Sequence, residues 1–174
     1  MLKQSVLNSI IDVLDYPKKG VIFKDLTPIL KNAEYFKYVT EELVKHIKEN
    51  YPETTHIASP ESRGFWFGCS VAALGGYGFI PFRKPGKLPR KCKTVDFDLE
   101  YGSETLCAHA DSLEENDNVF IIDDVLATGG TLCAMETLIK DFGASVKGIA
   151  VVLELSFLKG REVIKNPLHA LYRI

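Results

Sequence analysis

A short apolar run followed by two carboxylates and two glycines constrains this 174-residue chain more than any other segment. Val119–Ile122 holds four apolar residues, three of them β-branched, which is typical of a strand buried within a parallel sheet. Asp123 and Asp124 follow where that strand is expected to end, and Gly129-Gly130 precede an apolar-periodic segment that starts at Thr131. The order of strand, loop and helix predicts an α/β fold.

The glycine loop before the expected helix favours a phosphate site. Free backbone N–H groups and the positive end of the helix dipole suit an anion there, and ligands bind beyond the carboxyl ends of parallel strands. Asp123 and Asp124 repel anions and suit sugar hydroxyls or a metal instead. Taken singly, Gly-Gly is ordinary turn chemistry and Asp-Asp a solvated strand end. The whole run favours a sugar-phosphate site, although neither common phosphate-loop pattern occurs in the chain.

Alternating strands and helices predict one domain over residues 1–174, an open parallel sheet with helices on both faces. Pro81 lacks a backbone N–H, which places its strand at a sheet edge or its residue at a strand end. The expected strands are 57–58, 79–82, 106–110, 119–122 and 150–153. The expected helices are 2–14, one starting at Thr27-Pro28, 33–49, 64–74 and one from Thr131.

Composition and charge exclude several classes of protein. A net charge of −2 argues against binding to nucleic acid or to an anionic membrane, and no apolar run approaches the ~18 residues that span a bilayer. The four cysteines are widely spaced, which fits reduced thiols in the cytoplasm. No histidine pair has metal-ligand spacing, so no protein-bound metal is expected.

The 119–131 run resembles the phosphoribosyl pyrophosphate loop of the type I phosphoribosyltransferases, and further blocks are similar to the adenine phosphoribosyltransferase family. These blocks follow that family's order between about residues 16 and 161. They are Phe23–Pro28, Glu61–Phe65, Arg83-Lys84 with Gly86–Pro89, Leu99–Gly102, and Leu153–Leu155 with Leu158–Arg161. The resemblance implies the type I fold with a small N-terminal hood segment, a homodimer, and a transfer of phosphoribose from phosphoribosyl pyrophosphate to adenine. It also implies Mg²⁺, carried mainly by the substrate's diphosphate.

The resemblance assigns roles around the glycine loop. Asp123 and Asp124 would accept hydrogen bonds from the ribose hydroxyls. The 5′-phosphate would be held by the backbone N–H groups and hydroxyls of five consecutive residues, Ala127, Thr128, Gly129, Gly130 and Thr131.

Arg63 is the expected pyrophosphate ligand. It follows the expected strand 57–58 at the start of a helix, and its guanidinium can make a bidentate contact with an anion. A surface arginine at a helix start is the ordinary alternative. In this family the preceding turn holds an unusual backbone, so the resemblance also implies a cis peptide between Glu61 and Ser62.

The segment from Arg83 to Lys93 is strongly basic, with six cations and no acid among its eleven residues. A solvated loop is the ordinary interpretation of such a run. Here it follows a strand, and Lys84 and Lys87 match the family's loop motif, so we expect a mobile lid that closes over pyrophosphate. The remaining basic residues would only steer anions toward the site.

Glu100 and the hood segment are the expected partners of the base. A carboxylate within reach of adenine could relocate the proton that the ring loses as its N9 attacks, which makes Glu100 a catalytic candidate alongside Arg63. The hood residues Ile22, Phe23 and Lys24 would hold adenine by backbone groups and stacking, with Val125 or Leu126 opposite. An exposed turn glutamate and ordinary core side chains are the alternatives.

Two rival functions share the phosphate site. One is a phosphoribosyltransferase for guanine, hypoxanthine, xanthine or orotate, against which Glu100 and the hood segment argue. The other is a regulator that binds phosphoribosyl pyrophosphate without chemistry. That function calls for an added DNA- or protein-binding segment, for which 174 residues leave little room.

Overall fold

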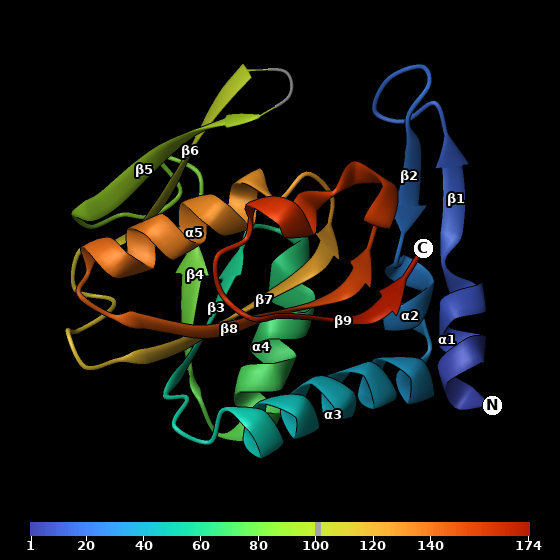
Figure 1. Ribbon diagram of the computed structural model, residues 1–174, viewed down its shortest axis with the longest axis horizontal. Coiled ribbons are helices and arrows are strands. Elements are labelled where there is room, and N and C mark those ends of the chain that lie inside the picture. Colours follow the sequence, from blue (N-terminus) through green and yellow to red (C-terminus); the bar gives the residue numbers. More distant parts are fainter. Residues whose placement is uncertain (100–101) are drawn as a thin grey trace.

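β7 (Asn118–Leu126) lies in the middle of a five-stranded parallel sheet with the order β4-β3-β7-β8-β9 (Figure 1). The computed structural model describes residues 1–99 and 102–174. Most of β7 is buried because helices cover both faces of the sheet, as its apolar run predicts. The flanking strands are β3 (His56–Pro60), β4 (Gly78–Phe82), β8 (Ser145–Glu154) and β9 (Leu168–Arg173).

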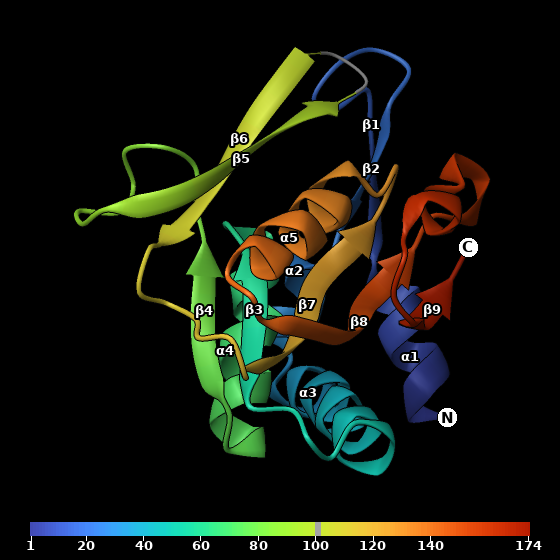
Figure 2. The ribbon, with the colours of Figure 1, turned by 60° about the vertical axis from the view of Figure 1, so that its left-hand side comes forward.

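Alternate residues of β7 enter two separate hydrophobic clusters. Phe120 and Ile122 pack with α3 (Ala33–Asn50) and α4 (Arg63–Gly75) on one face. Val119 and Ile121 pack with α5 (Gly130–Asp141) on the other. Figure 2 shows α5 on the opposite side of the strands from α3. Each fully buried Ile or Phe side chain stabilises the fold by about 1.5–3 kcal/mol, so the sheet and its helices form a rigid base for the site.

The N-terminal segment that leads to the hood residues 22–24 does not form the long helix predicted over 2–14. α1 (Leu2–Ser9) is followed by the antiparallel strands β1 (Ile11–Leu14) and β2 (Ile22–Asp25), and then by α2 (Thr27–Lys31). The expectation of a helix over 2–14 is therefore wrong beyond Ser9. The β-branched side chains in 11–14 suit a strand, and pairing with β2 outweighs their helical spacing.

A two-stranded hairpin stands apart from the main sheet (Figure 2). It consists of β5 (Cys92–Leu99) and β6 (Gly102–His109), which pair antiparallel. The strand expected over 106–110 is present, but it belongs to this hairpin and not to the parallel sheet. Pro81 lies on the edge strand β4, as predicted.

Two short 3₁₀ turns, η1 (Ser156–Leu158) and η2 (Gly160–Val163), connect β8 to β9. The turns lie beside the beginning of α5 in the view of Figure 1. None of the helices in the described parts of the chain is long and apolar enough to cross a membrane.

Candidate active site

Three neighbouring pockets lie around the carboxyl ends of β3, β7 and β8. The loop pocket, about 70 Å³, is lined by Asp123 and residues 125–132. The turn pocket, about 320 Å³, is lined by residues 60–64, by 123–125 and by Thr131. The hood pocket, about 400 Å³, lies between residues 20–24 of the hood and residues 155–158. Arg63 and Val125 line both the turn pocket and the hood pocket, so these two pockets adjoin.

The loop pocket contains all five residues that the sequence assigned to the 5′-phosphate. Ala127 to Thr131 line it, and α5 begins at Gly130 with its free N–H groups facing the loop. Gly129 adopts φ +88°, a left-handed conformation that glycine reaches without strain. A small pocket formed by backbone at a helix start suits an anion.

Asp123 and Asp124 lie inside β7, because the strand runs four residues beyond the predicted end. Both are buried, and the Asp124 N–H donates to Asp123 Oδ1 at 2.8 Å. Burial, reinforced by the neighbouring Asp124 carboxylate, raises the pKa of Asp123 well above its usual range. Asp123 is therefore able to hold a proton beside Asp124.

Arg63 bridges two of the pockets. As the first residue of α4, it places Nε 2.6 Å from Asp124 Oδ2 and its guanidinium 4.5 Å from the centre of the Phe23 ring. Asp124 Oδ2 accepts no well-directed hydrogen bond, so the contact is an ion pair whose N–H points elsewhere. The peptide bond between Glu61 and Ser62 is cis, as expected from the family resemblance.

The hood pocket gathers most of the residues expected around a base. Ile22, Phe23 and Lys24 line one wall, and Val125 lines another. Leu126 points away into the core beneath α5 and is only 1% exposed, so Val125 is the residue that faces the hood. The Lys24 ammonium is bound by Asp12 at 2.6 Å, which leaves the Lys24 backbone as its contribution to the pocket.

Sequence reasoning missed three apolar residues of the hood pocket, Leu155, Phe157 and Leu158. Phe157 is 68% exposed, which is unusual for a large aromatic side chain and marks a surface that a ligand can cover. Leu155 and Leu158 belong to the block that resembles the family, and Phe157 lies between its two parts.

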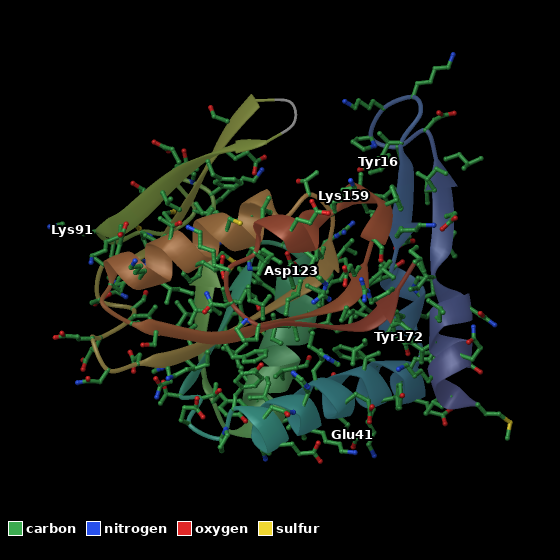
Figure 3. All side chains as sticks on the ribbon, viewed as in Figure 1. Tyr16, Glu41, Lys91, Asp123, Lys159 and Tyr172 are labelled. Carbon is green, nitrogen blue, oxygen red and sulfur yellow. The ribbon has the colours of Figure 1, made fainter. Side chains whose placement is uncertain are left out.

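Most cations of the basic segment, Arg83 to Lys93, are paired with carboxylate or carbonyl oxygens in this structure. Lys84 and Lys87 line none of the three pockets. The Lys87 carbonyl accepts from Arg83 Nη1 at 3.1 Å. Lys91 lies at the far end of the hairpin from Asp123 (Figure 3). The other partners are Glu61 for Arg83 at 2.6 Å, Glu104 for Lys84 at 2.9 Å, Asp111 for Arg90, and the Asp141 carbonyl for Lys93 at 2.7 Å.

Glu100, with its neighbour Tyr101, lies outside the described residues. In the parts of the chain that the structure describes, no three His, Cys, Asp or Glu side chains form a group able to hold a metal ion. All four cysteines are free thiols.

His46 and His169 stack on each other away from the site, with ring centroids 3.9 Å apart. Burial lowers the pKa of both rings, that of His169 to about 4 with further help from His46. The unfolded chain binds their protons below pH ~6.5. The two neutral rings therefore cost the folded state nothing above pH ~6.5. As the pH drops from there toward 4, the free energy of unfolding decreases, because the unfolded chain gains protons that the folded chain does not.

We expect the wild type to lose about 1 kcal/mol more stability than His169→Phe between pH 7 and pH 4.5, a figure reduced for the half-exposed position of the rings. Urea unfolding midpoints across that range measure the difference. If the urea midpoints of the two proteins changed with pH by the same amount, the lowered pKa of His169 would be contradicted.

Comparison with known proteins identifies close relatives. Residues 27–166 match the model of the phosphoribosyl transferase domain family. Adenine phosphoribosyltransferase of Solidesulfovibrio magneticus is 46% identical over 155 residues, covering 89% of this chain and 90% of that protein. The enzyme of the same name from Methanococcus vannielii is 46% identical over 152 residues, 87% of each chain.

Solved structures agree over the full length. The crystal structure of adenine phosphoribosyltransferase from Thermoanaerobacter pseudethanolicus superposes with a TM-score of 0.95 at 40% identity and covers 99% of both chains. The Saccharomyces cerevisiae enzyme, solved with an imino-altritol bisphosphate and adenine, gives 0.93 at 34% identity and 98% coverage of both. The Giardia lamblia enzyme, solved with 9-deazaadenine, gives 0.93 at 36% identity, covering 100% of this chain and 98% of that one.

Proposed function

This chain belongs to the phosphoribosyltransferase family and, within it, to the adenine phosphoribosyltransferases. On that premise, we propose which residues of the site bind each part of the two substrates. The enzyme transfers the 5-phosphoribosyl group of phosphoribosyl pyrophosphate to adenine, giving AMP and pyrophosphate. Positive charge develops on the ribose while a highly negative group departs. A catalyst must therefore bind pyrophosphate with cations, hold the sugar rigidly and exclude water.

The loop pocket binds the 5′-phosphate. One observation carries this assignment. The left-handed Gly129, the start of α5 and the residues Thr128 and Thr131 all line one small pocket at the end of β7. The loop is already folded in the position that an anion needs, so little ordering is required on binding.

Asp123 and Asp124 bind the ribose hydroxyls and stabilise positive charge on the sugar. With its raised pKa, Asp123 can donate as well as accept a hydrogen bond. A buried anion in a site from which water is excluded acts strongly on a cationic transition state.

Arg63 binds the departing pyrophosphate. Its ion pair with Asp124 holds the guanidinium at the border of the turn pocket, and a diphosphate of higher charge competes for the same donors. Lys84 and Lys87 contribute once the segment before the hairpin closes, with Lys84 exchanging Glu104 for a phosphate oxygen.

The hood pocket binds adenine. The ring lies against Phe23, with Val125 on the other side, and backbone groups of Ile22 and Lys24 recognise its edge. Glu100 then relocates the proton released from the ring.

A Mg²⁺ ion carried by the diphosphate would supply neutralisation of part of its charge. The described residues would suit a substrate-borne ion, because the turn pocket is lined by Asp123, Asp124 and Glu61, Glu61 is paired with Arg83, and no group of three or more metal-ligating side chains is found among them. The Asp123 and Asp124 carboxylates can hold its water ligands.

We further propose one domain over residues 1–174 and a homodimer in the cytoplasm. The hood residue Val6 belongs to the same core cluster as the sheet, which supports one domain. On α4, Leu74 is 54% exposed and Phe65 is half-buried, and these accessible apolar side chains support a dimer interface. The four free thiols support a reducing compartment.

A pyrophosphate-release assay with Arg63→Lys tests the assignment of Arg63 to pyrophosphate. Lysine keeps the charge but loses the bidentate contact, so we expect KM for phosphoribosyl pyrophosphate to rise about 10- to 100-fold. Arg90→Lys is the matched control, because Arg90 is a paired surface cation outside the three pockets. Equal behaviour of the two variants would remove Arg63 from the pyrophosphate site.

The same assay offers adenine, guanine, hypoxanthine and orotate in parallel, with and without Mg²⁺. Release should require adenine and Mg²⁺, with AMP formed in equal amount. Comparable turnover of guanine or hypoxanthine would contradict the hood assignment, and full activity after chelation of the metal would contradict the role of Mg²⁺.

A further inference from the structure

Glu154 is a buried carboxylate at the end of β8, and two arginines neutralise it. Arg161 contacts both of its oxygens, through Nη2 at 2.5 Å and Nε at 3.1 Å. Arg173 also reaches both oxygens, at the longer distances of 3.2 Å from Nε and 3.3 Å from Nη2. Hydrogen bonds from Arg161, together with the charges of the two arginines, hold the pKa of Glu154 below its usual range. The carboxylate is therefore an anionic anchor whose geometry is fixed.

The two arginines differ in what else they hold. Arg161 donates a further hydrogen bond from Nη1 to the Leu168 carbonyl at 2.7 Å, so it joins the end of β8 to the start of β9. Arg161 also belongs to η2, and its backbone continues directly from Gly160. Arg173 is more exposed and lies in β9, remote in sequence from the turn.

Gly160 packs against the backbone of the phosphate loop. A Cβ at Gly160 would lie 2.1 Å from the Ala127 carbonyl oxygen, and a Cβ at Gly129 would lie 2.7 Å from the Gly160 carbonyl oxygen. The η2 turn and the loop are thus in direct backbone contact, with no space for a side chain between them. Any shift of the turn moves the wall against which the loop rests.

The turn has few anchors of its own. The backbone N–H groups of Lys159, Glu162 and Ile164 donate within the turn. The thiol of Cys133 gives a hydrogen bond to the Val163 carbonyl, but thiols are weak donors. The bidentate pair between Arg161 and Glu154 is the strong, charge-assisted connection to the sheet.

We propose that Arg161 is a positioning residue for the 5′-phosphate. Its ion pair with Glu154 holds Gly160 in contact with Ala127–Gly129, and this contact keeps the phosphate loop in its anion-binding conformation. Arg161 does not line any of the three pockets, so it acts through the backbone of the turn. The inference rests on the proposed role of the loop pocket and adds the residue that maintains it.

The test compares Arg161→Gln with Arg173→Gln, because each variant removes one cation from Glu154 and only the first releases the turn. The probes are ribose 5-phosphate and pyrophosphate, whose Kd values are measured by calorimetry, together with KM, kcat and melting temperature. We expect Arg161→Gln to weaken ribose 5-phosphate binding and to raise KM for phosphoribosyl pyrophosphate by roughly tenfold or more. Its pyrophosphate Kd and its KM for adenine should stay within about twofold of the wild type.

Arg173→Gln should leave all of these values within about twofold of the wild type. Arg161→Lys keeps the charge but loses the planar fork that contacts both Glu154 oxygens and the Leu168 carbonyl, so it should fall between the wild type and Arg161→Gln. It serves as the test should the glutamine variant not fold.

A lower melting temperature with unchanged ribose 5-phosphate binding in Arg161→Gln would overturn the proposal, as would equal weakening in the two glutamine variants. Wild-type protein that binds pyrophosphate but not ribose 5-phosphate would refute the loop assignment itself, and the inference with it.

Discussion

Replacing Gly129 by alanine is expected to weaken binding of ribose 5-phosphate and phosphoribosyl pyrophosphate by roughly a hundredfold. Two effects combine at this position. The backbone has φ +88°, which costs an alanine about 1 kcal/mol. The added Cβ would also lie 2.7 Å from both the Gly160 carbonyl oxygen and a Val163 methyl group, so the loop or the turn must move. Calorimetry with ribose 5-phosphate measures the loss.

Gly76→Ala is the matched control for the backbone effect. Gly76 has φ +82° at the end of α4, and a Cβ there would meet nothing within 4 Å. It should lose a similar stability from strain and keep its affinity for ribose 5-phosphate. If Gly129→Ala changes affinity no more than Gly76→Ala does, the loop is not the phosphate site.

Replacing Glu100 by glutamine is expected to lower kcat by about 100-fold or more while KM for phosphoribosyl pyrophosphate changes little. The amide keeps the size and one acceptor oxygen but cannot take up the proton of adenine. The expectation follows from family membership and the match of Leu99–Gly102, because Glu100 lies outside the described residues. Steady-state kinetics with both substrates separate the two constants.

Glu41→Gln is a suitable control, since Glu41 is exposed on α3, well away from Asp123 in Figure 3. It makes the same chemical change without touching the site and should retain wild-type kinetics. Unchanged kcat in Glu100→Gln would exclude Glu100 from the mechanism and direct attention to another proton acceptor.

The central part of the fold was predictable because its sequence signals are local. A β-branched run, two aspartates and a glycine pair encode β7, the carboxylates and the loop within thirteen residues. Burial on both faces makes such a strand apolar throughout, whichever side chains surround it. The loop and Arg63 could therefore be placed from the sequence, and the structure brings them together around one edge of the sheet.

The hood and the hairpin were less predictable because their form depends on pairing between segments. Leu2, Val6 and Ile10 have helical spacing, yet Ile11 to Leu14 pair with β2 as an exposed ribbon. The hairpin strand 92–99 alternates polar and apolar residues from Thr94 to Leu99, a strand signal that the sequence-based prediction did not use. Its pairing with β6 is a non-local property that sequence periodicity does not encode.

The positions of individual side chains were the hardest to foresee. Lys84 and Lys24 are bound by Glu104 and Asp12, which come from other strands and could not be paired from the sequence. Leu155, Phe157 and Leu158 meet the hood only because β8 ends beside it. Such contacts follow from the tertiary arrangement of elements that are distant along the chain.

The proline on β4 has a consequence for how copies of this enzyme can meet. Gly78 donates to the Thr55 carbonyl and the Phe82 carbonyl accepts from Glu61, so the even-numbered residues of β4 face β3. Pro81 therefore faces outward along the free border of the sheet, where it offers no N–H to an incoming strand. Growth of the sheet from one molecule into the next is blocked there. The border of β4 is therefore a poor template for pairing with a strand of another molecule.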